Sequence, residues 1–227
     1  MTKESRARIA LRLMAIKGQS ETLERLHRAI EFEITASSKR IRRAAASGNE
    51  DLIESITIEE CLAVEELLGL AFVAAQSFIT SIRTELIVVA KVYSREFGSK
   101  LSFTADPQAY DALKLAPMLA APKCSAVEAI HAVANYWKHS EEWPVLEKKS
   151  GGRLRKAWDL DALKGKKRSA EIVTALGLVP NSMGNLRKAA KALGVVEFDD
   201  LSTLRQILSD WAAELLKKAR TEFGVKP

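Results

Sequence analysis

Residues 125–144 read SAVEAIHAVANYWKHSEEWP, and this stretch combines a helix start, a helical period, a polar stripe and a helix stop. Ser125 and Glu128 have the spacing of a capping box, in which hydroxyl and carboxylate satisfy amides that the first turn leaves unpaired. Pro144 cannot continue a helix, and it biases Trp143 away from helical geometry. The stretch therefore predicts one buried helix that ends before Pro144.

The two sides of this predicted helix differ in polarity. Successive residues of a helix are turned by about 100°, and with this period the apolar residues lie on one face and the polar residues on the other. The apolar side carries Ala126, Ala129, Ile130, Val133, Tyr136 and Trp137. The polar side carries Glu128, His131, Asn135, Lys138, His139 and Glu142. Two of the three histidines of the chain lie on the polar side, so we place the candidate active face there.

Composition favours an all-α fold. The chain has 227 residues, 47% of them hydrophobic, with only 11 glycines and 6 prolines. Long runs of Ala, Leu, Glu, Lys and Arg favour helices, and alternating strand patterns are nearly absent. Besides the helix after residue 125, we predict helices over residues 4–46, 57–97, 107–115, 169–176, 182–192 and 199–223.

The predicted helix over residues 57–97 is apolar on nearly every side. Thr57 and Glu60 form a second capping-box pattern at its start, and Gly98 follows its end. Its longest uncharged run, residues 67–82, includes polar residues and is shorter than the roughly 20 apolar residues that span a bilayer. We therefore expect a core helix covered by several others, and no membrane partner.

Cysteine content and the N-terminus favour a cytoplasmic protein without cofactors. Cys61 and Cys124 stand in apolar surroundings, which indicates neither a disulfide framework nor a cysteine metal site. Residues 1–18 lack the continuous apolar run of a signal peptide. The spacing of Glu128, His131 and His139 is not a recognised ligand set, so we expect no metal. His27 has no supporting pattern, and we expect it on the surface.

Basic residues gather towards both ends of the chain. Residues 1–48 carry 11 basic and 5 acidic side chains and residues 146–227 carry 17 and 10, whereas residues 49–145 carry 7 and 14. A nucleic-acid partner and solvated helix faces both explain such a distribution.

We predict a bundle over residues 1–146, a basic linker over 147–168 and a helical extension over 169–227. The candidate nucleic-acid-binding residues are Lys148, Lys149, Arg153, Arg155, Lys156, Lys166, Lys167 and Arg168.

Residues 169–192 have the length and turn residues of a helix-turn-helix. Arg187, Lys188 and Lys191 lie on the second predicted helix, where such a motif reads DNA. A helical hairpin without DNA-binding activity has the same pattern, so both interpretations stay open.

The segment ANYWKHSEEWP, residues 134–144, resembles the C-terminal helix motif of the HEPN superfamily, all-α domains of many RNases and toxins in prokaryotic conflict systems. That motif is an arginine, four to six intervening residues and a histidine, commonly with a polar residue directly after the arginine. His139 matches the histidine, and Asn135 matches the polar residue. The three positions permitted for the arginine hold Ala132, Val133 and Ala134.

The resemblance implies a HEPN-like bundle that acts on RNA, with two such helices meeting across a homodimer interface. The implied activity is metal-independent endonucleolytic cleavage, in an effector of phage defence or of a toxin–antitoxin system. Such cleavage needs proton carriers, for which histidine is suited, and a cation beside the phosphate. We assign His139 as acid or base, Asn135 as the residue that orients His139 or the phosphate, and Lys138 or an arginine from elsewhere as the cation.

A non-catalytic interpretation competes with this one. A histidine at a helix edge is commonly a hydrogen-bonded structural residue, and His131, Asn135 and His139 can tie a bundle together. The chain is then a helical module that binds nucleic acid or a partner protein. The missing arginine favours this alternative.

Overall fold

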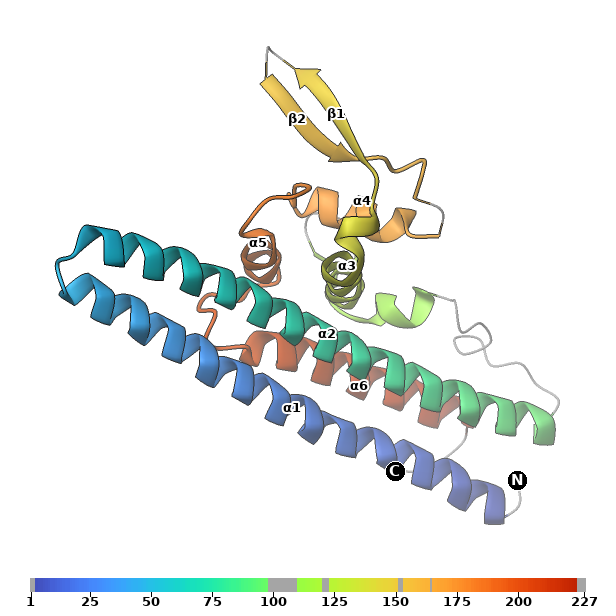
Figure 1. The fold of residues 1–227 in the computed structure, drawn as a ribbon. Coiled ribbons are helices and arrows are strands. Elements are labelled where there is room, and N and C mark those ends of the chain that lie inside the picture. The colour runs from blue at the N-terminus through green and yellow to red at the C-terminus, as the bar shows by residue number, and fades with distance from the viewer. Residues whose placement is uncertain (1–2, 98–109, 120–122, 151–152, 164, 224–227) are drawn as a thin grey trace.

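The computed structural model describes residues 3–97, 110–119, 123–150, 153–163 and 165–223. Over these residues the protein is all-α apart from one two-stranded sheet, which confirms the predicted fold class (Figure 1). The elements in chain order are α1 (Lys3–Ala46), α2 (Glu50–Phe97), the 3₁₀ helix η1 (Tyr110–Leu115), α3 (Ala126–His139), the 3₁₀ helix η2 (Ser140–Glu142), β1 (Val145–Ser150), β2 (Arg153–Trp158), α4 (Lys167–Ala175), α5 (Asn185–Ala192) and α6 (Ser202–Phe223).

The long helices α1 and α2 form an antiparallel hairpin, and α6 packs against both (Figure 1). The start predicted for α2 at Thr57 is wrong. The helix begins after Asn49, whose Oδ1 accepts a hydrogen bond from the backbone N–H of Leu52 at 3.1 Å. An asparagine at this position satisfies one unpaired amide of the first turn. Glu60, expected in a cap, instead forms an ion pair with Arg40 of α1.

The core of the molecule is centred on α2, which packs against α1, α3, α5 and α6. Its residues Leu68, Phe72, Ile79 and Ile82 have no exposed surface. By length and composition α2 also has the features of a membrane-crossing helix, but a core helix has the same features, and half of its apolar window is buried inside the fold. Contacts with four other helices account for its composition.

The histidine of α1 was expected on the surface, and that expectation is wrong. His27 is fully buried, and its Nε2 donates to the backbone oxygen of Ala71 in α2 at 3.2 Å. Its Nδ1 is buried without a hydrogen-bond partner among the described atoms. Burial is the main cause that lowers the pKa of His27 to about 4, so the ring is neutral at pH 7.

Helix α3 crosses above α2 at a steep angle, and its start is the one predicted (Figure 1). The backbone N–H of Ser125 donates to Glu128 Oε2 at 2.8 Å, and the N–H of Glu128 donates to Ser125 Oγ at 3.0 Å. This is a complete capping box. At the crossing, a Cβ on Gly69 of α2 would collide with the ring of Trp137. Only glycine lets the two helices approach this closely.

Residues 147–168 were predicted as a linker, but much of this segment is ordered as a β-hairpin. β1 pairs with β2 in antiparallel register, with Val145 opposite Trp158. Trp143 and Trp158 are buried and pack edge-to-face on each other, with ring centroids 5.7 Å apart. Both also pack edge-to-face on Tyr136 of α3, at 5.9 and 5.6 Å. This aromatic cluster fixes the base of the hairpin to α3.

The three C-terminal helices begin and end within three residues of their predicted limits. On α6 the side chains of Leu204, Leu208 and Leu215 are fully buried. They belong to the same hydrophobic core as α2 and α3. The described part of the C-terminal segment therefore packs into the bundle. The predicted helix over 107–115 is seen as η1, and residues 107–109 lie outside the described part of the chain.

Candidate functional site

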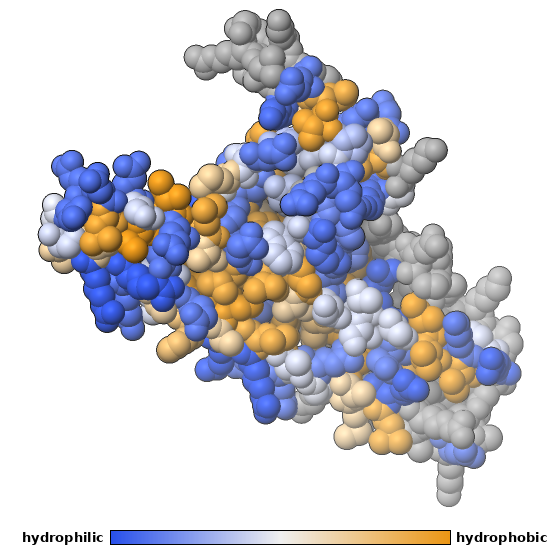
Figure 2. Space-filling model, in the orientation of Figure 1, coloured by the Kyte–Doolittle hydropathy of each residue, from blue (hydrophilic) through white to orange (hydrophobic). Residues whose placement is uncertain are grey.

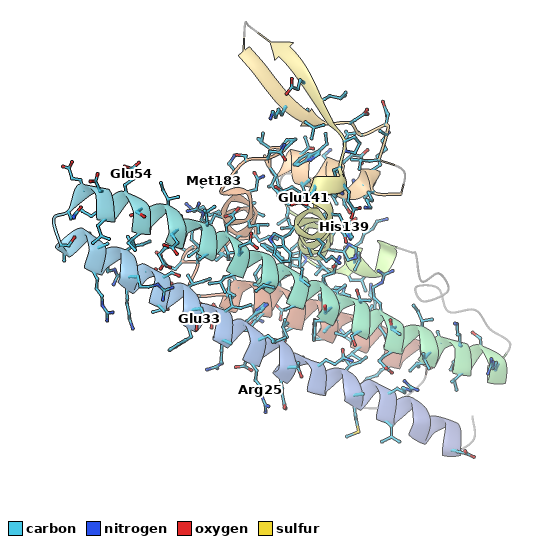
Figure 3. All side chains as sticks on the ribbon, viewed as in Figure 1. Arg25, Glu33, Glu54, His139, Glu141 and Met183 are labelled. Atoms are coloured by element: carbon cyan, nitrogen blue, oxygen red, sulfur yellow. The ribbon has the colours of Figure 1, made fainter. Side chains whose placement is uncertain are left out.

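His139 is the last residue of α3, and its side chain is 38% exposed. Figure 3 labels it at the end of α3, above α2 in that view. Its Nδ1 lies 3.1 Å from Glu142 Oε1, and Glu142 Oε2 accepts a hydrogen bond from Lys166 Nζ at 2.7 Å. We call His139, Glu142 and Lys166 the His139 cluster. It joins the end of α3 to the turn before α4.

The His139 cluster fixes which ring nitrogen faces a substrate. Hydrogen bonds from Lys166 and then from His139 lower the pKa of Glu142, so this carboxyl group is ionised at neutral pH. A carboxylate only accepts hydrogen bonds, so Nδ1 of His139 carries the proton that it donates to Glu142. The lone pair of the neutral ring is then on Nε2. Among the described residues nothing forms a hydrogen bond with Nε2.

Asn135, predicted as an orienting residue for His139, takes part in a different network. Its Oδ1 accepts a hydrogen bond from Gln76 Nε2 of α2 at 2.7 Å. Its Nδ2 lies 3.2 Å from His131 Nδ1 and 3.3 Å from Ser169 Oγ of α4. Asn135 therefore ties α3 to α2 and α4, and the structure does not bring it together with His139.

This network determines the protonation of His131. Gln76 Nε2 also donates to the backbone oxygen of His131 at 3.4 Å, which orients the Gln76 amide and, through it, the Asn135 amide. Asn135 Nδ2 is then a donor, so His131 Nδ1 accepts and the neutral ring carries its proton on Nε2. Burial, followed by the charges of Arg83 and Lys138, lowers the pKa of His131 to about 4.

Three of the candidate nucleic-acid-binding residues each pair with an acidic residue of the chain. The pairs are Lys166 with Glu142 at 2.7 Å, Lys167 with Asp161 at 3.3 Å and Arg168 with Glu128 at 3.4 Å. Lys156 is exposed and lies opposite Glu147 in the hairpin. The side chains of Lys148, Lys149, Arg153 and Arg155 lie outside the described part of the structure, although their backbone belongs to β1 and β2.

The cations of the helix-turn-helix candidate are held against the chain itself. The contacts are Arg187 with Glu65 at 3.3 Å, Lys188 with the backbone oxygen of Gly177 at 3.2 Å, and Lys191 with the ring of Phe198 at 5.6 Å to the centroid. A second helix that reads DNA presents such side chains to the duplex. This arrangement favours the interpretation of residues 169–192 as a structural helical hairpin.

Glu142 was predicted on the polar side of the helix, but its contact with His139 was not predicted. The signal was its position three residues after His139, which a 3₁₀ turn brings alongside the histidine. Lys166 was predicted as a nucleic-acid ligand, and its contact with Glu142 depends on the path of the chain after the hairpin. No group of three His, Cys, Asp or Glu side chains within the described ranges is placed to hold a metal ion.

No known family of sequences matches the protein, and neither a curated protein nor a solved structure is significantly similar to it.

Proposed function

We propose that this protein is a HEPN-like RNA-acting protein in which His139 transfers protons during metal-independent cleavage of RNA. The observation that carries the proposal is the His139 cluster. The His139 imidazole is partly exposed. Its Nδ1 is held by the Glu142 carboxylate, which leaves Nε2 to face a substrate. A base held by a second group in this way is the common arrangement for activating a hydroxyl.

In the proposed reaction His139 Nε2 takes the proton of a ribose 2′-hydroxyl. The 2′-oxygen then forms a bond to the adjacent phosphorus, and the bond from phosphorus to the 5′-oxygen breaks. The products are a 2′,3′-cyclic phosphate and a 5′-hydroxyl end, whose proton comes from a second acid. In the expected homodimer, a second copy of His139 supplies that acid. Glu142 stabilises the imidazolium that forms on His139.

A non-catalytic module is the second candidate, and the position of Asn135 favours it. The Asn135 side chain bonds to Gln76, His131 and Ser169, so it does not assist His139 as the resembled motif implies. In this version the same surface binds RNA or a partner protein without cleaving it. The two candidates differ in whether RNA is cut.

The test is incubation of purified protein with total RNA in EDTA. We expect cleavage by the wild type and a loss of about 10²- to 10⁴-fold in His139→Ala, the usual contribution of a general acid or base. Glu141→Ala is the matched control, because Glu141 is an exposed neighbour outside the His139 cluster (Figure 3). The new 5′ ends should carry hydroxyl groups.

Circular dichroism and thermal melting check that His139→Ala keeps the fold. Cleavage that persists in this variant, or that requires a divalent ion, removes His139 from the mechanism. RNA binding without any cleavage supports the non-catalytic module.

A further inference from the structure

The helical hairpin of α1 and α2 has one face that the other helices and strands of the described ranges leave uncovered. Helix α6 contacts α1 at Glu31, whose Oε1 accepts a hydrogen bond from the backbone N–H of Leu201 at 2.6 Å. Helices α3 and α5 contact α2 at Gly69 and Glu65. These contacts lie on one side of the plane through α1 and α2. The other side, which we call the open face, is turned towards the viewer in Figure 1.

Exposed apolar side chains are spread along the open face. They are Leu11, Leu26 and Phe32 on α1 and Leu52 and Leu70 on α2. Two grooves of about 570 and about 200 Å³ are lined by residues of α1 and α2 alone. Figure 2 shows hydrophobic surface over the middle of the helical hairpin. Apolar surface that follows two packed helices in this way is typical of an interaction surface.

The end of the helical hairpin near its turn carries opposite charges on the two helices. Residues 35–46 of α1 hold four basic and no acidic side chains, whereas residues 50–66 of α2 hold seven acidic and no basic ones. Lys39 follows Phe32 by seven residues and Glu59 follows Leu52 by seven, so both lie on the open face. Both are exposed, and among the described residues neither has an ion-pair partner.

Lys39 and Glu59 lie at the same level of the helical hairpin. Their neighbours in sequence, Arg40 and Glu60, pair across the two helices, with Arg40 Nη2 at 2.9 Å from Glu60 Oε2. Lys39 and Glu59 are on the outer edges of α1 and α2, away from each other. Within one chain these two charges therefore stay apart, although they have opposite signs.

We propose that the open face binds a second copy of this chain, with a two-fold axis that runs along the helical hairpin. This axis places α1 of one protomer against α2 of its partner and keeps the two turns at the same end. Lys39 then lies opposite the partner's Glu59, and Phe32 lies within about a turn of the partner's Leu70. Opposite charges and apolar side chains both meet, so the open face is complementary to itself. An axis across the helical hairpin would instead set α1 on α1 and leave Lys39 and Glu59 apart.

The resulting interface is a four-helix bundle made of two helical hairpins. It is separate from the α3 contact that the HEPN resemblance implies, because α3 packs on another side of α2, at Gly69 and Gln76. Both interfaces can form in one assembly. The inference does not depend on the proposed action on RNA.

Sedimentation equilibrium of the full chain over a range of concentrations measures the Kd of the dimer. Phe32→Asp should raise this Kd at least about tenfold, because it places a charge among the apolar residues of the interface. Phe32 is 71% exposed, so the fold should be unaffected, and circular dichroism checks this. Val196→Asp is the matched control, since Val196 is an exposed apolar residue outside the open face, and its Kd should equal that of the wild type.

A charge exchange tests the direction of the axis. Lys39→Glu and Glu59→Lys should each weaken the dimer several-fold, because each places like charges opposite each other. An equal mixture of the two variants should associate as tightly as the wild type, and only contacts between chains can cause this recovery. A wild type that is monomeric at every concentration overturns the proposal, as does a dimer that Phe32→Asp leaves unchanged. A mixture that associates no better than either variant alone also overturns it.

Discussion

The two ends of α3 carry similar groups in opposite surroundings. At the N-terminal end Glu128 is 4% exposed and bonds to the backbone of Ser125 and to Arg168. At the C-terminal end the Glu142 side chain is 60% exposed and bonds to His139 and Lys166. Each carboxylate thus joins α3 to a basic residue near the start of α4.

The difference in burial separates a structural role from a chemical one. Removing one partner of a buried hydrogen bond leaves the other partner without a hydrogen bond in a place that water does not reach. This lowers the free energy of unfolding. Exposed ion pairs contribute little to stability, because water and salt screen them. A solvent-accessible carboxylate beside a histidine can instead orient that histidine towards a substrate. Stability should therefore depend on Glu128, and activity on Glu142.

The largest effect on stability is expected for Glu128→Ala. This change leaves the amide of Ser125 without its acceptor and Arg168 without its partner, so we expect a loss of about 3 kcal/mol in the free energy of unfolding. Urea denaturation measures it. Glu128→Gln is the matched control, because glutamine also serves in a capping box and should lose less. Equal losses in both variants would show that charge, and not the cap, stabilises this end.

The histidines extend the contrast between buried and exposed groups. Histidine in the unfolded chain takes up a proton near pH 6.5, whereas His27 and His131 in the folded chain do so near pH 4. The unfolded chain therefore binds more protons between these values, and stability falls as the pH is lowered through this window. From about pH 7 to about pH 5 each of the two should remove about 2 kcal/mol.

The contribution of His27 can be isolated by measuring urea denaturation against pH in His27→Leu. This variant should lose about half of the pH dependence that the two histidines cause. The same pH dependence in His27→Leu and wild type would rule out His27 as a source. Below about pH 4 both states are protonated, and these groups cause no further loss.

A smaller effect is expected for Ser125→Ala, at about 1 kcal/mol. The hydroxyl accepts from the amide of Glu128 and donates to the backbone oxygen of Leu113 at 2.6 Å, so its loss weakens both the cap and the contact with η1. Thermal melting measures the change. Ser125→Thr should restore most of it if the hydroxyl is responsible, and a Thr variant as unstable as Ala would contradict the capping role.

Local rules in the sequence predicted one end of α3 better than the other. The capping box of Ser125 and Glu128 depends on residues three apart, so spacing alone identifies it. The role of Asn135 is set by Gln76, which lies 59 residues away in the chain, and no local pattern contains that contact. Thr57 shows the opposite error. Thr57 and Glu60 have the spacing of a capping box, but they lie inside a helix that begins earlier, after Asn49.

The hairpin over β1 and β2 was missed for a related reason. Its strands are rich in charged residues and lack the apolar alternation by which half-buried strands are recognised. Its base is instead held by Trp143 and Trp158, which pack on Tyr136 of α3. Figure 2 shows the exposed polar surface that extends from the bundle towards this hairpin. Aromatic residues that flank a basic segment were thus the available signal for an anchored structure.

The smallest effect on stability and the sharpest test of the comparison come from Glu142→Gln. Because Glu142 is exposed, we expect less than about 0.5 kcal/mol of change in the free energy of unfolding. The cleavage rate should nevertheless fall at least about tenfold, since glutamine neither requires the Nδ1 proton nor stabilises an imidazolium. RNA affinity should be unchanged or slightly higher, because a negative charge has been removed beside the bound phosphates.

A variant that cleaves like wild type would mean that Glu142 only holds the end of α3. A parallel loss of cleavage and of RNA affinity would mean that the substitution disturbs binding, because an orienting group lowers the rate and leaves the affinity intact.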